Sequence, residues 1–379
     1  MSQHATARTE LARLIHERRM SYEEFAEYVE KYARDHGEPG TLSVRHVQRL
    51  AVGKRDDGKP LGPVRKATAR LLERIFSTDI ETLLGPPKSG SRPVPELARL
   101  IGNSKKVSPH LIALLKEQIA MLRRLDRELG ARVAYNEVKA KERQVSELRK
   151  YSLTPSMRTE LGILQAELCT LAGWQAFDLG DSIAAWNFYE KSKAAAADAG
   201  QLLHLSYAHA EQASILIDLG MCREAVDVLE ALDRRGAPSL LRSWFSAALG
   251  EAYAAAGRSK ESQRSFDEAM CLPLGEPSIN VPYVALDEVS LQRWRASALA
   301  KSGDIRAATA LESSLQRMDP SSVRAVVSLR VDLVGAYLLT KNLVLAQNHL
   351  DQALRSAEEI GSVRHSAKLR VLEHKLACA

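Results

Sequence analysis

The strongest constraint on the fold is a repeated pattern of turns in the C-terminal half of the chain. From about residue 155 onward, a turn residue recurs at steps of 40, 37, 46 and 39 residues. The five turn markers are Gly180, Gly220, Gly257, Gly303 and Asn342. Steps of about 34–47 residues are typical of helical repeats, in which each helix pair buries its apolar face against the next pair.

Small residues recur at two fixed positions around these turns. Five residues after each glycine, and four after Asn342, the chain has Ala185, Ala225, Ser262, Ala308 and Ala346. Seven residues before each marker it has Gly173, Ala213, Gly250, Ala296 and Gly335. Large residues follow nine positions after three of the glycines, or eight after Asn342: Tyr189, Leu229, Phe266 and Leu350. The pattern predicts five helix pairs whose backbones cross closely at the small residues.

These repeats resemble the tetratricopeptide family. The best single match is Leu249-Gly-Glu-Ala-Tyr253, followed by Gly257, Ser262, Phe266, Ala269 and Pro273, with serine in place of the usual alanine. The long step before Gly303 predicts an insertion around residues 275–282. The resemblance covers about residues 155–361 and implies an α-solenoid, but it does not identify a ligand.

The N-terminal part is predicted to contain several short helices. Ser21 and Glu24 have the spacing of a capping box. Ser43 is expected to cap a helix over residues 44–52, and Gly53 to end it. The segment from Ser43 to Gly53 resembles the XRE-type helix-turn-helix of bacterial repressors. It departs from that pattern in its long second helix and in a longer turn around residues 35–42.

Together these features predict an all-α chain with three parts. Residues 1–87 are expected to form a helix-turn-helix DNA-binding domain, residues 88–154 a helical linker or dimerisation segment, and residues 155–379 a tetratricopeptide-repeat sensor domain. The layout is similar to actinobacterial regulators with tetratricopeptide sensor domains and to the peptide-sensing quorum regulators often called RRNPP. The resemblance implies a cytoplasmic transcriptional regulator, acting as a homodimer, whose repeat domain receives a signal or a protein partner.

Basic residues are concentrated in the N-terminal part. Residues 1–150 hold 30 of the 53 Lys and Arg but only 20 of the 47 Asp and Glu, which indicates a polyanion partner for this part. If the helix over residues 44–52 enters the major groove, Arg45 and Arg49 could read guanine and Gln48 adenine. The full set of residues predicted to contact double-stranded DNA is Ser43, Arg45, His46, Gln48, Arg49, Lys54, Arg55, Lys59, Arg65 and Lys66. Ordinary solvated charges are the alternative interpretation.

The first helix of each tetratricopeptide pair is expected to line the concave face. Residues projected onto it are Glu167, Trp174, Phe177, Tyr207, Trp244, Glu251, Arg293 and Lys301. Aromatic rings with a few charges suit a peptide or a small amphipathic ligand. Trp174 and Phe177 could instead be packing residues between repeats, and Asp178 and Asp181 could cap or pair near a turn.

The sequence predicts neither an enzyme nor a bound cofactor or metal. It lacks a phosphate-binding G-x-x-x-x-G-K-[ST] loop and an H-E-x-x-H pair. Its four cysteines are far apart, which predicts reduced and mostly buried thiols. The first residues have no apolar core of a signal peptide, so we expect a cytoplasmic location. The main alternative function is a tetratricopeptide adaptor that binds only proteins and no DNA.

Overall fold

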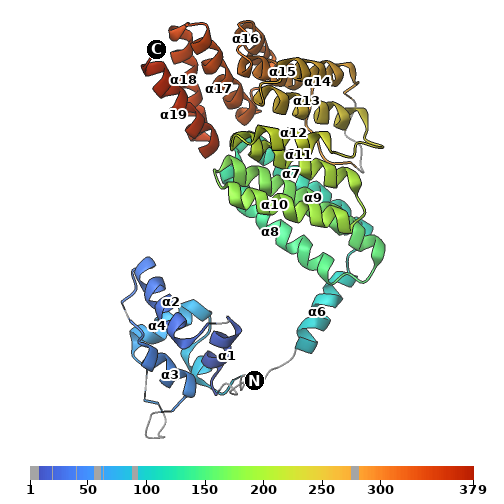
Figure 1. Cartoon of the computed structure of the whole chain (residues 1–379). Coiled ribbons are helices and arrows are strands. Elements are labelled where there is room, and N and C mark those ends of the chain that lie inside the picture. Colours follow the sequence, from blue (N-terminus) through green and yellow to red (C-terminus); the bar gives the residue numbers. More distant parts are fainter. Residues whose placement is uncertain are drawn as a thin grey trace. The chain divides into compact units, whose positions relative to one another are not determined.

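The computed structural model describes residues 8–18, 20–39, 41–54, 61–62, 64–87, 93–274 and 281–379. All regular secondary structure in these ranges is helical, so the fold is all-α, as predicted (Figure 1). The chain forms two compact units, residues 1–98 and residues 99–379, which are called unit 1 and unit 2 below. No helix in the described ranges is both long and apolar enough to cross a lipid bilayer.

Unit 1 is a small helical domain around one apolar core. Its helices are α1 (Glu10–Glu17), α2 (Tyr22–Asp35), α3 (Val44–Val52), α4 (Lys66–Phe76) and α5 (Ile80–Leu84). The predicted capping box at the start of α2 is confirmed, because the Ser21 hydroxyl accepts from the Glu24 amide at 3.1 Å and the Glu24 carboxylate accepts from the Ser21 amide at 2.7 Å. Phe25 and Val29 of α2 are buried in the same core as Val47 of α3. The helices α2 and α3 therefore form a helix-turn-helix.

The end of α3 is fixed by contacts with the segment before α1. Gly53 ends the helix with a φ of +73°, a conformation that favours glycine. A Cβ atom at this position would come within 2.9 Å of the Thr9 methyl group. The Thr9 hydroxyl also donates to the carbonyl oxygen of Ala51 at 2.8 Å. These contacts hold the inner side of α3, and they leave its outer side toward solvent.

Unit 2 is a solenoid of paired helices, which Figure 1 shows stacked one pair on the next. Helix α6 (Pro93–Lys105) crosses the boundary between the two units. The others are α7 (Pro109–Leu129), α8 (Ala131–Lys150), α9 (Pro155–Asp178), α10 (Ser182–Asp198), α11 (Leu202–Asp218), α12 (Cys222–Glu230), α13 (Ser239–Ala255), α14 (Ser259–Cys271), α15 (Glu288–Lys301), α16 (Ala307–Arg317), α17 (Val323–Leu339), α18 (Leu343–Glu359) and α19 (Val363–Ala377). The segment predicted as a linker thus contributes α7 and α8 to this compact unit, where α8 packs along α9.

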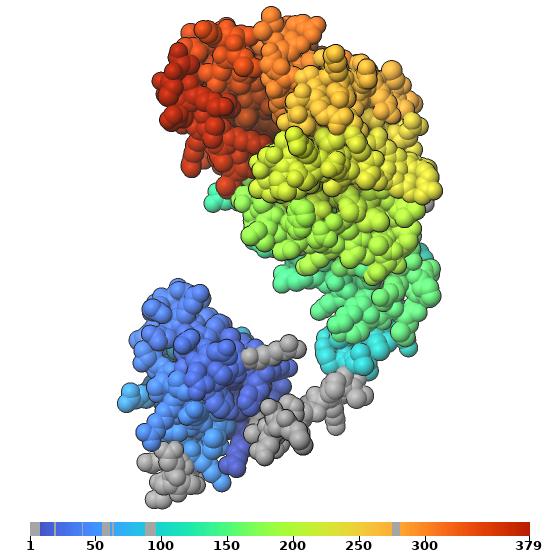
Figure 2. All heavy atoms as spheres, viewed as in Figure 1, coloured from blue at the N-terminus to red at the C-terminus, as the bar shows by residue number. Residues whose placement is uncertain are grey.

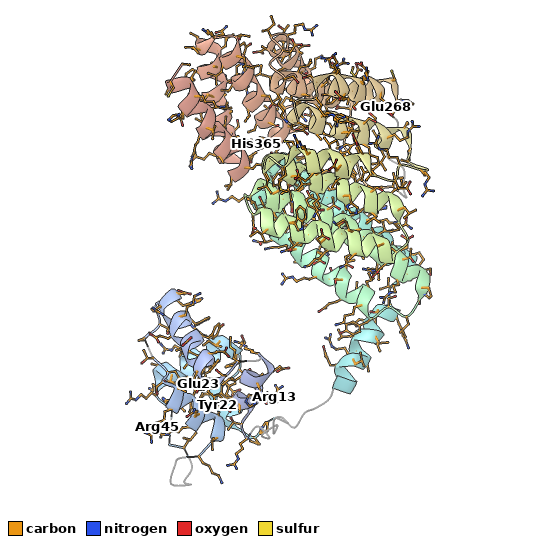
Figure 3. All side chains as sticks on the ribbon, in the orientation of Figure 1. Arg13, Tyr22, Glu23, Arg45, Glu268 and His365 are labelled. Atoms are coloured by element: carbon orange, nitrogen blue, oxygen red, sulfur yellow. The ribbon has the colours of Figure 1, made fainter. Side chains whose placement is uncertain are left out.

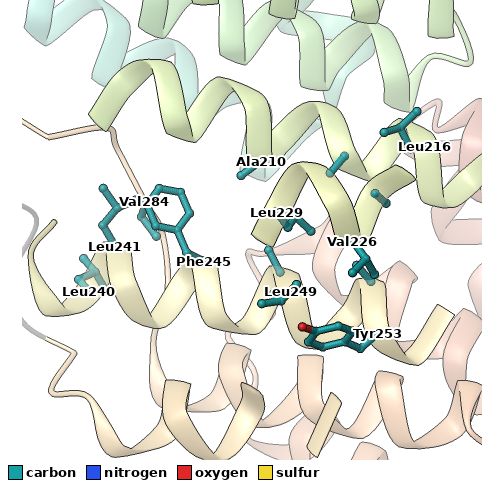
Figure 4. Packing of buried hydrophobic residues seen from close by; sticks show 14 residues of the cluster. Ala210, Leu216, Val226, Leu229, Leu240, Leu241, Phe245, Leu249, Tyr253 and Val284 are labelled. Atoms are coloured by element: carbon teal, nitrogen blue, oxygen red, sulfur yellow. The ribbon is translucent and has the colours of Figure 1, made fainter. Parts of the chain in front are cut away.

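The predicted helix pairs are α9–α10, α11–α12, α13–α14, α15–α16 and α17–α18. Each buries apolar side chains against the next pair, which provides the core of a solenoid. Figure 4 shows one such cluster, in which Phe245 and Leu249 of α13 pack with Leu216 of α11 and Leu229 of α12. The predicted insertion lies mostly at residues 275–280, outside the described residues; residues 281–287 lead from there into α15.

Four of the five predicted turn markers hold the left-handed backbone that a tight turn requires, and the fifth prediction was wrong. Gly180, Gly220, Gly257 and Gly303 all have positive φ, but in the last pair Lys341 takes this conformation, with a φ of +56°. Asn342 instead caps α18 through its side-chain oxygen, which accepts from the Leu345 amide. Asparagine suits both positions, so the marker was placed one residue late.

This one-residue shift also corrects the predicted crossing point of the last pair. The rings of Tyr189 and Phe266 lie against Gly173 and Gly250, where an added Cβ atom would come within 3.0 and 2.7 Å. Gly335 has no heavy atom within 4 Å of such a Cβ position. Counted from Lys341, the equivalent position is Val334, which is buried. Gly335 is therefore not a helix-crossing residue.

The prediction of mostly buried cysteines was also wrong. Only Cys169 is buried, while Cys222 is half-buried and Cys271 and Cys378 are exposed. The two exposed thiols stand at the C-terminal ends of α14 and α19, where the chain leaves the packed part of the helix.

The glycine contacts predict opposite effects of one substitution at two sites. Gly250→Ala should lower the unfolding free energy of unit 2 by about 1–3 kcal/mol, because the methyl group overlaps the Phe266 ring. Gly335→Ala should raise it by about 0.5–1 kcal/mol, because alanine favours the helix and meets no neighbour. All four tryptophans belong to unit 2, so their fluorescence in urea follows its unfolding. Equal effects of the two substitutions would contradict this packing.

Candidate functional site

A cavity of about 1280 Å³ lies on the concave side of unit 2. Its walls come from α7, from the first helix of each pair (α9, α11, α13, α15 and α17), from residues 282–287 and from α19. Ligand pockets in proteins usually measure about 300–1,000 Å³, so this cavity could hold a ligand larger than a typical metabolite.

Seven of the eight residues predicted for the concave face line this one cavity. They are Glu167, Trp174, Tyr207, Trp244, Glu251, Arg293 and Lys301. Phe177 does not line it: its ring is buried in the core, and the Arg364 guanidinium lies 4.2 Å from the ring centroid. The packing interpretation is therefore correct for Phe177, whereas Trp174 both lines the cavity and lies near Arg324.

Three aromatic rings form a row across three consecutive first helices. The ring centroid of Tyr207 of α11 lies 4.8 Å from that of Trp244 of α13, and Trp244 lies 5.9 Å from Trp294 of α15. Such distances are typical of attractive aromatic pairs. The row gives the cavity a continuous apolar wall that can hold apolar ligand groups.

The row is anchored by a partly exposed ion pair. Glu251 accepts from the indole nitrogen of Trp294 at 2.7 Å and from the Lys301 ammonium at 2.5 Å. Burial by itself would raise the pKa of Glu251, but Lys301 lowers it to about 2. The carboxylate is therefore charged at neutral pH and fixes the orientation of Trp294.

A second ion pair lines the same cavity. Arg123 of α7 lies 3.2 Å from Glu167 of α9, and His204 of α11 lies 3.7 Å from the same carboxylate. The Arg123 guanidinium also lies 4.4 Å from the ring centroid of Tyr283. Tyr283 precedes α15, so this contact holds the segment after the insertion against α7.

Glu211 of α11 is one of the acidic groups lining the cavity that form no ion pair with a described residue. Its carboxylate accepts from the Tyr207 hydroxyl at 2.7 Å, and it forms no ion pair with any residue that the structure describes. Burial raises the pKa of Glu211 to about 7, although the hydrogen bond from Tyr207 opposes this shift. Glu211 stands one helical turn after Tyr207, so the spacing of the sequence could have identified it.

A network of ion pairs joins the first and last helices of unit 2. Arg324 of α17 lies 2.8 Å from Asp126 of α7 and 3.0 Å from Asp178 of α9. Asp178 also accepts from the Ser362 hydroxyl at 2.6 Å, and it lies 3.5 Å from His365, which Figure 3 labels. Burial would raise the pKa of Asp178, but His365 and Arg324 lower it to about 2. The positive charge of Arg324 is thus compensated by a carboxylate on each side.

The same closure is visible in two further contacts. Arg364 and Lys368 of α19 both reach Asp218 of α11, at 2.6 and 2.9 Å. A Cβ atom on Gly130, between α7 and α8, would come within 2.6 Å of the Ile360 carbonyl oxygen. In Figure 2 the red C-terminal helices accordingly touch teal atoms from the start of unit 2. The solenoid therefore closes on itself within one chain.

The residues predicted to contact DNA lie mostly at the surface of unit 1. Arg45 and Gln48 of α3 are exposed, and Figure 3 shows Arg45 at the rim of this unit. Ser43 caps α3 by accepting from the backbone amide of His46. The side chains of His46 and Arg49 are half-buried. Lys54, Arg65 and Lys66 are exposed, whereas the predicted residues Arg55 and Lys59 lie outside the described residues.

Several of these groups stand close together. Burial lowers the pKa of His46, and the charges of Arg49 and Arg65 lower it further. Arg65 immediately precedes α4, so α3 and the start of α4 present their cations on one side of unit 1. A phosphate backbone carries the complementary charge.

Comparison with known proteins gives little additional information. No protein-family model and no curated protein sequence matches the chain. Among solved structures, the apo form of the quorum sensor NprR from B. thuringiensis is similar, at 16% sequence identity over 73% of each chain and a TM-score of 0.41. The function proposed below therefore rests on the geometry of the two units. The XRE type and the actinobacterial origin remain predictions from the sequence.

The closing network predicts a large effect of one buried cation. Arg324→Gln should lower the unfolding free energy of unit 2 by about 3–5 kcal/mol, because it leaves the carboxylates of Asp126 and Asp178 buried without their partner. The matched control is Arg235→Gln, which removes an ion pair to Asp233 at a surface where Arg235 is 89% exposed. We expect that control to leave the urea midpoint of tryptophan fluorescence unchanged, and equal midpoints of both variants would contradict the network.

The raised pKa of Glu211 predicts a pH-dependent stability. Its folded-state pKa of about 7 exceeds the ordinary value of 4.5, so the folded state binds the proton more tightly than the unfolded state does. The contribution of protonated Glu211 to the stability of unit 2 is therefore fully present below pH 4.5 and is lost as the pH rises through 7. Glu211→Gln should therefore stabilise unit 2 by up to about 3 kcal/mol at pH 8 and very little at pH 4.5. A gain of the same size at both pH values would argue against it.

Proposed function

We propose that the chain is a sequence-specific DNA-binding transcriptional regulator whose second unit binds a signal molecule. The observation that supports DNA binding is the outer side of α3. Val47 and Leu50 fix the inner side of this helix in the core, and Arg45 and Gln48 project from its exposed side. A helix-turn-helix with such a second helix can place its polar residues against base edges.

The surrounding cations supply the second requirement for DNA binding. Lys54, Arg65 and Lys66 are exposed around α3 and can contact phosphates, which provide affinity without sequence information. We propose that Arg45 and Gln48 read bases and that these three residues hold the backbone. A homodimer would present two such helices to an inverted repeat, with half-sites about one helical turn apart. A regulator of this kind acts in the cytoplasm.

The cavity of unit 2 supports the signal-binding part of the proposal. It combines an aromatic row with fixed charges, which is the composition of sites for peptides and small amphipathic molecules. Binding of a ligand at α11, α13 and α15 would change the packing of the solenoid and could thereby alter the position of unit 1 on DNA. The proposal does not require catalysis by any of these residues.

DNA binding can be tested by mixing the full-length protein with fragmented genomic DNA of its source organism and sequencing what is retained at moderate salt. We expect a recurrent inverted repeat for the wild-type protein. Arg45→Ala combined with Gln48→Ala should lose this preference, by about ten- to hundredfold for each base contact removed. Both side chains are exposed, so the double variant should keep the fold.

A control variant that removes two exposed cations from α2 separates base reading from general attraction. Lys31 and Arg34 are exposed on α2. Replacing both by alanine should weaken binding to all DNA sequences by the same factor or not at all, so the inverted repeat is still retained. Retention that depends on salt but not on sequence, and that the α3 substitutions do not change, would instead favour an adaptor that binds only proteins.

A further inference from the structure

Several charged side chains that line the cavity of unit 2 already have a partner of opposite charge. Arg123 is paired with Glu167, Lys301 with Glu251, and Arg324 with two aspartates. A buried charge without such a partner costs free energy, so an exception indicates a site for a missing partner. The exceptions among the described lining residues include Arg293 of α15, Glu211 of α11 and Asp332 of α17, of which Asp332 accepts from the Ser297 hydroxyl.

Arg293 has hydrogen-bond donors that no described residue satisfies. Its Nε is buried and has no acceptor, and no described carboxylate lies at ion-pair distance from its guanidinium. The acidic residues around it are engaged elsewhere. Glu251 is bound by Lys301, Asp287 caps α15 by accepting from the Ser290 amide at 2.7 Å, and Asp332 accepts from the Ser297 hydroxyl at 2.5 Å.

A guanidinium in this state suits an incoming carboxylate. Its planar donors match the two oxygens of a carboxylate, and such charge-assisted hydrogen bonds are about twice as strong as neutral ones. The neighbouring Trp294 cannot compete for the ligand, because its own nitrogen is held by Glu251.

Glu211 is the complementary exception. Its carboxylate holds one hydrogen bond from Tyr207, which leaves acceptor positions open toward the cavity that it lines. An ammonium or guanidinium group of a ligand would provide the missing charge.

The aromatic row connects these two groups. Tyr207 stands beside Glu211, Trp294 is next to Arg293 in α15, and Trp244 lies between the two rings. Packed helices have axes about 8–10 Å apart, so the two steps from α11 to α15 cover roughly 16–20 Å. An extended peptide covers this distance with about five or six residues.

We propose that the cavity selects a dipolar ligand of oligopeptide size, whose free carboxylate binds Arg293 and whose cationic group binds Glu211. The apolar middle of the ligand lies along Tyr207, Trp244 and Trp294. This inference rests on the proposed signal-binding function of unit 2 and adds which two residues determine the ligand chemistry and its direction in the cavity.

The test uses full-length protein and a synthetic mixture of random hexapeptides in three forms: both ends free, the carboxyl end amidated, and the amino end acetylated. Peptides retained on ultrafiltration with the protein are identified by mass spectrometry, and their affinities are measured by tryptophan fluorescence. We expect each blocked end to weaken binding by about tenfold or more. Arg293→Gln should abolish only the preference for the free carboxyl end, and Glu211→Gln only the preference for the free amino end or a basic side chain.

Matched controls remove the same charges at exposed positions of the same cavity. Arg124→Gln and Glu128→Gln should keep both preferences. If Arg293→Gln fails to fold, Arg293→Lys tests the same point, because it keeps the charge and should reduce the preference for a free carboxyl end without removing it.

The outcomes separate this inference from the proposed function. Peptides that bind the wild-type protein equally well in free, amidated and acetylated form would overturn the roles of Arg293 and Glu211 and leave signal binding intact. The same conclusion follows if the controls change the preferences as much as the two variants do. If the wild-type protein retains no peptide of any form, both this inference and peptide signalling are wrong, while DNA binding is still decided by the genomic experiment.

Discussion

The buried guanidinium of Arg324 joins the two ends of the solenoid, and it lines the cavity that the closed solenoid surrounds. It bridges Asp126 of α7 and Asp178 of α9 from the far side of the unit, in α17. Removing three charged groups from water is costly, and an apolar cluster of the same volume would often give more stability. An ionic contact has strict geometry, however, and it pairs only these helices. The network is therefore best understood as fixing where the last repeats meet the first.

Closure also changes the electrostatics inside the cavity. Side chains that would be solvated on an open concave face become shielded, and Coulomb interactions between them strengthen. This explains why most cations of the interior have acidic partners, and why Glu211, which has none, has a pKa of about 7. In a closed solenoid, an unpaired Arg293 is a stronger indication of a ligand than the same residue on an open surface would be.

The sequence predicted the features that depend on local contacts. The Ser21–Glu24 capping box, the end of α3 at Gly53 and the glycine turns depend on a few neighbouring residues, so their spacing was sufficient. The concave face was also predictable, because each first helix turns the same side inward.

The turn at Lys341 was missed because asparagine is suitable for a left-handed turn and for a helix cap, and only the backbone distinguishes the two. The residues of the closure could not be predicted. Whether Arg324 meets Asp126 depends on the small rotation between each repeat and the next, added up over five repeats. A local sequence pattern does not determine this total rotation.

The cations around α3 and the closing ion pairs of unit 2 differ in their exposure to solvent, and therefore in their response to salt. The cations around α3 are mostly exposed, so salt screens them, and any contact they make with phosphates weakens steeply as counterions accumulate. The closing pair of Arg324 and Asp126 is shielded, and salt affects such a pair far less. Ionic strength should thus act more on the cations around α3 than on the closing network of unit 2. If unit 1 binds DNA and unit 2 binds a signal, as proposed, salt weakens the phosphate contacts of unit 1 while the closing network that shapes the cavity of unit 2 persists.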